Sequence, residues 1–204
     1  MTRRLEIFVE DIRFADILLP AAYQIAVASG VTLEINRPTI LRGCRAPLLK
    51  EHVRRTQETD IVLIAADAMN SEHRLRASFR RKRAALEELV GLGPPSRSYA
   101  VAEPSVEAWL LSDLPALTAG LETSLQRQLT VPPTMAAPRT EREAKELLGK
   151  TIQRIVGETL ARSGFEFADA IVERMDLANA HADSLRDWAR DFERLIRQAP
   201  SLHN

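Results

Sequence analysis

The chain has 204 residues, of which 45% are hydrophobic and 27% are charged, and its 28 basic residues balance its 28 acidic ones. A chain of this size and composition is long enough for one globular domain with an appended lobe, and it does not have the composition of a disordered protein. The net charge of zero excludes a general electrostatic attraction to nucleic acid or membranes, so any such contact needs a local basic patch.

Patterns typical of strands and helices alternate through the first half of the chain. Short apolar, β-branched or alternating runs predict four strands, at residues 4–10, 31–36, 60–66 and 98–103. The segments between them have the spacing of amphipathic helices: 14–30, 46–57 and 71–93. Because strands separated by helices pair in parallel through right-handed crossovers, we expect an α/β fold with a mostly parallel sheet of about four strands.

The second half of the chain predicts helices only. Pro104 suits the first turn of a helix, and a proline-rich break follows at residues 131–138. Thr140 and Glu143 then have the spacing of a capping box, which opens a helix reaching about residue 162. Two more helices are expected, at 167–176 and 184–199.

These elements predict two parts, an α/β core over residues 1–113 and a helical lobe over residues 114–204 that packs on it. Three large aromatic side chains of the helical segments are expected in the core: Trp109, Trp188 and Phe192. No stretch resembles a signal peptide or a membrane span, and the single cysteine, Cys44, cannot form an internal disulfide. We therefore expect a cytoplasmic protein that does not contact membranes.

Three of the predicted strands end on an acid, namely Glu10, Asp67 and Glu103. Ligands of open parallel sheets bind outside the carboxyl ends of the strands, so these carboxylates converge if their strands are neighbours. Oxygen ligands suit Mg²⁺, which takes one or two carboxylates and completes its shell with water and substrate phosphate. The alternative is that the acids only start turns or cap the following helices.

The order of these acids, followed by "AVAEPSVEAWLLSD" at residues 100–113, resembles the small stand-alone Toprim-like proteins of bacteria and archaea. In that family, the first strand ends in Glu-Gly, the third ends in Asp-x-Asp, and the fourth leads into Glu-x-x-x-Glu-Ala-Trp. The likeness covers nearly the whole chain. The matching residues are Glu10, Asp67, Glu103, Glu107, Ala108 and Trp109.

The resemblance implies a Toprim-like, Rossmann-like fold and Mg²⁺-assisted chemistry on a nucleic-acid phosphodiester, with Mn²⁺ as a substitute metal. Toprim domains of topoisomerases, primases and overcoming-lysogenization-type nucleases use the first-strand glutamate as acid or base, and their aspartates hold Mg²⁺. Asp67 would then be the principal metal ligand, Glu10 the general base or second ligand, and Glu103 a helper at the metal. Glu107 would brace the site from behind.

Two positions depart from the family pattern. Asp11 stands where a glycine would follow Glu10, and Met69 stands where the second aspartate would follow Asp67. A thioether is a poor ligand for Mg²⁺. The alternative function is therefore a non-catalytic Toprim-like binding or scaffolding module that works with a partner protein such as an ATPase.

Two arginine-rich segments, 36–47 and 73–83, flank the expected site. Their arginines are candidate contacts to nucleic-acid phosphates: Arg42, Arg45, Arg74 and Arg80. For the second segment, the alternative is a solvated helix face that pairs with Glu87 and Glu88. The chain has no glycine-rich phosphate loop, so a nuclease of this type, acting as an effector in antiphage defence, would work beside a separate ATPase.

Overall fold

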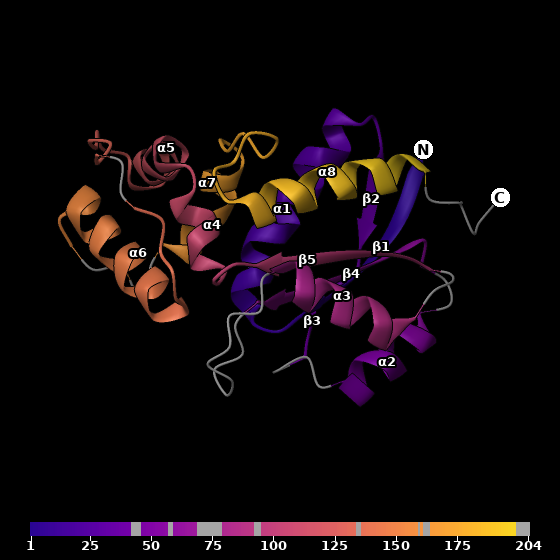
Figure 1. The fold of residues 1–204 in the computed structure, drawn as a ribbon. Coiled ribbons are helices and arrows are strands. Elements are labelled where there is room, and N and C mark those ends of the chain that lie inside the picture. The colour runs from indigo at the N-terminus through magenta and orange to yellow at the C-terminus, as the bar shows by residue number, and fades with distance from the viewer. Residues whose placement is uncertain are drawn as a thin grey trace.

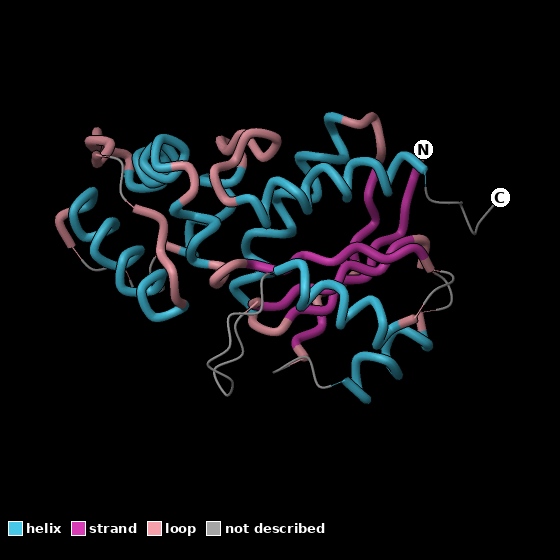
Figure 2. Tube along the Cα trace, viewed as in Figure 1, coloured by secondary structure: helices cyan, strands magenta, loops and turns pink. Residues whose placement is uncertain are grey.

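The structure, a computed structural model, describes residues 1–41, 46–56, 59–68, 79–91, 95–133, 136–158, 160 and 164–198. Within these residues the protein is α/β, with one parallel sheet of five strands and eight α-helices (Figures 1 and 2). The predicted fold class is therefore confirmed. None of the described helices combines the length and the apolar character that a membrane span requires.

All strand pairs in the sheet are parallel, in the order β2–β1–β4–β5, and β3 pairs with the end of β1. The strands are β1 (Thr2–Val9), β2 (Thr32–Ile35), β3 (Thr39–Ile40), β4 (Ile61–Asp67) and β5 (Ser96–Ala102). The sequence did not predict β3, because a strand of two residues is too short to show an alternating pattern.

Helices cover both faces of the sheet (Figure 1). On one face lie α1 (Ile12–Ala28) and α8 (Asp183–Gln198), and on the other lie α2 (Ala46–Arg55) and α3 (Phe79–Val90). Successive residues of β4 therefore enter different cores, as Leu63 packs with α1 and Ile64 packs with α2 and α3. The first six residues of β4 are buried, as expected for a strand that is covered on both faces.

The chain reverses its direction across the sheet at β1. It first moves from β1 through α1 to β2, and it then returns through α2 to β4 and continues through α3 to β5. Right-handed crossovers consequently place α1 on one face and the other two helices on the opposite face. In open parallel sheets, ligands bind between the carboxyl ends of the two strands where the order reverses. Those strands here are β1 and β4.

Four helices lie beyond the carboxyl ends of the strands, before α8 returns along the sheet (Figure 1). They are α4 (Glu107–Leu111), α5 (Leu114–Leu125), α6 (Glu141–Val156) and α7 (Ala168–Val172), the last preceded by the 3₁₀ turn η2 (Phe165–Phe167). These helices share one hydrophobic core with α1, α8 and the sheet. The expected core aromatics Trp109, Trp188 and Phe192 are all buried in it, which confirms that prediction.

The predicted boundaries of α4, α6 and α7 are wrong, and α7 ends at Val172 rather than at residue 176. The Glu103–Pro104 peptide bond is cis, and α4 begins at Glu107 rather than at Pro104, which lies in the preceding bend. The expected cap of α6 is confirmed, because the Thr140 hydroxyl accepts a hydrogen bond of 3.1 Å from the Glu143 amide. That helix ends at Val156 because Gly157 adopts a left-handed conformation with φ of 83°.

Candidate functional site

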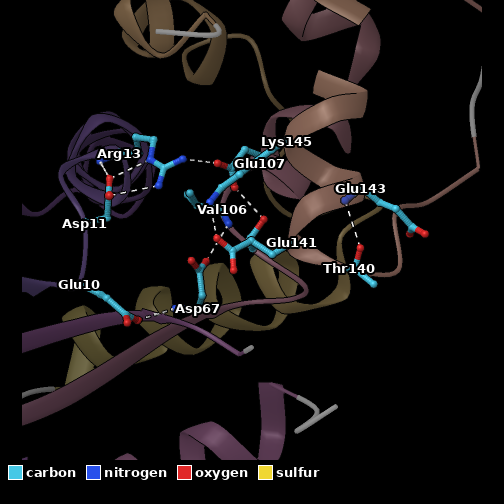
Figure 3. Close-up of polar contacts among 11 residues, drawn as sticks. Glu10, Asp11, Arg13, Asp67, Val106, Glu107, Thr140, Glu141, Glu143 and Lys145 are labelled. Atoms are coloured by element: carbon cyan, nitrogen blue, oxygen red, sulfur yellow. Dashed lines mark hydrogen bonds and ion pairs between the residues drawn. The ribbon is translucent and has the colours of Figure 1, made fainter. Parts of the chain in front are cut away.

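Asp67 and Glu10 lie together at the carboxyl ends of β4 and β1 (Figure 3). The backbone amide of Asp67 donates a hydrogen bond of 3.1 Å to Glu10 Oε2. The parallel register that pairs Val9 with Ala65 fixes this arrangement, so no long loop is needed to bring the two acids together. We call Glu10 and Asp67 the strand-end pair. It lies at the carboxyl ends of the two strands where the strand order reverses.

The Asp67 side chain is held by the segment that follows β5. Asp67 Oδ1 accepts a hydrogen bond of 3.0 Å from the backbone amide of Val106, the residue before α4. Within the described part of the chain, the second oxygen of Asp67 and the second oxygen of Glu10 accept no hydrogen bond. Within the described residues, the pair therefore offers two carboxylates that the backbone orients, each with one oxygen that accepts no hydrogen bond.

Burial and neighbouring acids raise the pKa of both members of the pair. Loss of hydration is the largest cause for Asp67, followed by the negative charges of Glu107, Glu10 and Glu141, and the pKa of Asp67 rises to about 8. Burial also raises the pKa of Glu10, and the positive charge of Lys82 is the largest influence in the opposite direction. Carboxylates with raised pKa values in a crevice mark a candidate functional site.

Arg13 neutralises two other acids beside the pair (Figure 3). Its guanidinium forms an ion pair with the buried Glu107 and another of 2.8 Å with Asp11, the residue that caps α1. The hydrogen bond from Arg13 is the main reason why the pKa of Asp11 is lowered. Glu107 also accepts a hydrogen bond of 2.7 Å from the Ser105 hydroxyl. Among the described residues, no ion pair reaches the strand-end pair itself.

Helix α6 contributes an acid that the sequence did not predict. Glu141 is the first residue of α6, and Figure 3 shows its carboxylate pointing toward Asp67. Its charge raises the pKa of both members of the strand-end pair, and it forms an ion pair with Lys145 one turn further on. The capping signal at Thr140 places Glu141 in a first helical turn, but no sequence pattern places α6 over the strand ends.

The structure does not bring Glu103 to the strand-end pair. Its exposed carboxylate accepts a hydrogen bond of 3.2 Å from the backbone amide of Phe79, at the start of α3. The largest charge effects on the pKa of Asp67 come from Glu107, Glu10 and Glu141. Glu107, four residues later, takes the place beside Asp67 that the sequence assigned to Glu103.

Of the four arginines predicted to contact phosphate, Arg80 lies within the described residues. Its side chain is 79% exposed and approaches Asp187 of α8 to 4.0 Å. Several residues that figured in the sequence predictions lie outside the described residues: Arg42, Arg45, Cys44, Met69 and Arg74.

The basic face of α3 is partly neutralised. Arg83 forms ion pairs with Glu87 on the same helix and with Asp191 on α8, as expected for a solvated helix face. Lys82 differs from its neighbours on α3, because its charge acts on Glu10. This lysine is the basic residue of α3 that bears on the candidate site.

The oxygen ligands of the strand-end pair are those that Mg²⁺ prefers. No three His, Cys, Asp or Glu side chains of the described segments are grouped closely enough to enclose a metal ion. Mg²⁺ usually keeps several waters and binds one or two carboxylates together with substrate phosphate, rather than a closed protein cage. The pair therefore fits an open Mg²⁺ site that water and substrate complete.

Comparison of the chain with models of known protein families, with curated proteins and with solved structures finds no match. The functional argument therefore depends on the geometry and charge of the site.

Proposed function

We propose that the protein is a Toprim-like phosphodiesterase that cleaves nucleic acid with Mg²⁺, or with Mn²⁺ in its place. The observation that carries this proposal is the strand-end pair, in which Asp67 has a pKa of about 8. A buried carboxylate among other acids is costly to ionise in the free protein. A bound divalent cation removes that cost, because its own charge reverses the local preference for the neutral acid.

Each residue has a defined part in this proposal. Asp67 holds the metal through the oxygen that Val106 leaves free, and Glu10 accepts the proton of the attacking water or serves as the second ligand. When bound, Mg²⁺ would neutralise phosphate charge and lower the pKa of water. Glu107 keeps α4, and with it the Val106 amide, in position through its contacts with Arg13 and Ser105.

The charges around the pair support a phosphodiester substrate. Lys82 acts on Glu10 from α3, and the exposed Arg80 lies on the same helix. Both can contact a nucleic-acid backbone whose scissile phosphate reaches the pair. In this proposal the chain supplies cleavage as an effector in antiphage defence, and a separate ATPase partner supplies the nucleotide-driven step.

Nicking of supercoiled plasmid with Mg²⁺ or Mn²⁺ tests the proposal. The wild-type protein should nick, and Glu10→Gln should reduce the rate by about 100-fold or more, since general-base catalysis contributes about 10²–10⁴-fold. This variant retains an oxygen that can accept the Asp67 amide, so the fold is preserved. Asp169→Asn, an exposed change on α7, is the matched control and should retain activity. Equal nicking by wild type and Glu10→Gln would show that the activity comes from a contaminant.

A second candidate function is a non-catalytic Toprim-like binding or scaffolding module. The ion pairs of Arg13 favour this non-catalytic function, because Arg13 already neutralises Glu107 and Asp11. Met69 in place of the family's second aspartate favours it as well. This candidate predicts that millimolar Mg²⁺ leaves the thermal stability of the protein unchanged and that no nicking occurs.

A further inference from the structure

A cavity of about 450 Å³ lies next to the strand-end pair and shares α4 with it. Glu107 of that helix lies beside Asp67, whereas Ala108 and Leu111 line the cavity. The facing walls come from residues 136–138, from residues 179–182, and from Leu147 of α6. The cavity and the pair therefore adjoin the same short helix.

The lining of the cavity is apolar with acidic or neutral polar groups at its edge. Prolines, leucines and alanines form most of the surface, including Pro104, Leu114 and Pro115. The polar residues that line it are Glu103, Ser112, Asp113, Asn179 and His181. No lysine or arginine lines the cavity among the described residues. Such a surface repels phosphate and suits a flat, uncharged group that carries N–H donors.

We propose that the cavity binds a nucleobase of the substrate strand, turned out of its stack, while a nearby phosphate of the same strand reaches the strand-end pair. This inference rests on the proposed function and specifies its substrate as single-stranded or locally opened nucleic acid. The volume lies within the range of about 300–1,000 Å³ that is usual for small-molecule sites. The apolar walls pack against the faces of the base, and the acids at the edge accept hydrogen bonds from its amino group.

The position of Glu103 is explained by this inference. The residue turns away from the strand-end pair, lines the cavity, and uses one carboxylate oxygen to accept the Phe79 amide. Its other oxygen is available to an exocyclic amine, as carboxylates are for the N4 amine of cytosine. Cytosine, adenine and guanine are therefore favoured over thymine, which has no exocyclic amine.

Nucleoside binding in the presence of EDTA tests the inference without metal or cleavage. Titration calorimetry or saturation-transfer NMR with the four deoxynucleosides should give dissociation constants on the order of 0.1–1 mM for deoxycytidine, deoxyadenosine and deoxyguanosine. Thymidine should bind about tenfold more weakly. Ala137→Trp, at an exposed position on the cavity wall, should weaken all binding by about tenfold or more by filling the space. Ala85→Trp, on the exposed face of α3, is the matched control and should leave binding unchanged.

Two results would overturn the inference: no binding of any nucleoside up to about 10 mM, or equal binding by wild type and Ala137→Trp. Glu103→Gln should reduce the preference for amino-bearing bases while binding persists, because the amide replaces one charged acceptor. Nucleoside binding by a protein that never nicks DNA or RNA supports the cavity as a base site and overturns the nuclease proposal. Mg²⁺-dependent nicking without nucleoside binding overturns the cavity assignment alone.

Discussion

The backbone amide of Asp67 donates a hydrogen bond of 3.1 Å to Glu10 Oε2, so the main chain of two neighbouring strands holds these acids together. The Val106 amide fixes Asp67 from the other side. This arrangement keeps Asp67 partly buried, and its raised pKa makes the metal-free protein less stable at neutral pH than at low pH. Carboxylates whose raised pKa values lower the stability of the folded protein are typical of functional sites.

The raised pKa of Asp67 predicts how stability depends on pH. Its value of about 8 exceeds the ordinary 3.8, so between these values the folded protein binds more protons than the unfolded chain. The stabilising effect of the proton is therefore complete below about pH 4 and is lost as the pH rises through about 8. At about 1.4 kcal/mol per pH unit, the loss is roughly 6 kcal/mol at most.

Asp67→Asn isolates this contribution, because the amide is neutral at every pH and can still accept from Val106. In EDTA the variant should unfold at a slightly higher temperature than wild type at pH 5, where about 1.7 kcal/mol of the loss is already present. At pH 8 it should unfold about 10–20 °C higher, since about 1 kcal/mol shifts the midpoint of a protein of this size by ~2–4 °C. Thermal unfolding at both pH values checks this, and a difference that is the same at pH 5 and pH 8 would contradict the pKa assignment.

Arg13 is predicted to stabilise the fold by neutralising Glu107, whose side chain is only 3% exposed. Arg13→Leu leaves that carboxylate without its ion-pair partner. The loss should be about 2–3 kcal/mol, less than for a fully buried pair because Arg13 is itself 27% exposed. Denaturant unfolding of wild type and Arg13→Leu measures this loss in the free energy of unfolding.

The double variant Arg13→Leu with Glu107→Gln should recover part of this loss, because no unpaired charge remains. Arg197→Ala removes an exposed arginine from an ion pair on α8 and should leave the unfolding midpoint unchanged. An Arg13→Leu protein as stable as wild type would show that Glu107 does not depend on Arg13.

Gly120 is predicted to be required for the contact between α5 and α7. A Cβ atom at this position would lie 2.6 Å from Ile171 Cα, a distance that the backbone cannot accommodate without moving. Gly120→Ala should therefore destabilise the protein by about 1–3 kcal/mol. At Gly149 of α6 a Cβ atom would meet nothing within 4 Å, so Gly149→Ala should instead stabilise by about 0.5–1 kcal/mol. The two substitutions change the free energy of unfolding in opposite directions only if α5 and α7 pack as described. Denaturant unfolding of both variants tests this.

The features of this protein that the sequence predicts are those set by local patterns. The alternation of strands and helices and the acids at two strand ends are local, and parallel pairing then brings Glu10 and Asp67 to one edge of the sheet. The place of Glu107 beside Asp67 depends on where α4 lies after β5. No periodicity in the sequence reveals that position.

Two other parts of the site depend on tertiary contacts between distant segments. Glu141 lies beside Asp67 because α6 packs next to α4. Along the chain, the start of α6 is some seventy residues from the end of β4. The ion pair between Arg13 and Glu107 joins the start of α1 to the start of α4. Hydrophobic spacing predicts each of these helices, but it does not state which helices meet.

Mg²⁺ binding at the strand-end pair is the central claim, and titration calorimetry of wild type and Asp67→Asn at pH 7 tests it most directly. Wild type should bind Mg²⁺ at millimolar concentrations and release up to about one proton, because Asp67 is largely protonated in the metal-free protein. Asp67→Asn should bind at least about tenfold more weakly without proton release, and the exposed control Asp169→Asn should bind like wild type. Binding of the same strength and the same proton release in Asp67→Asn, or no binding by wild type, would contradict the account.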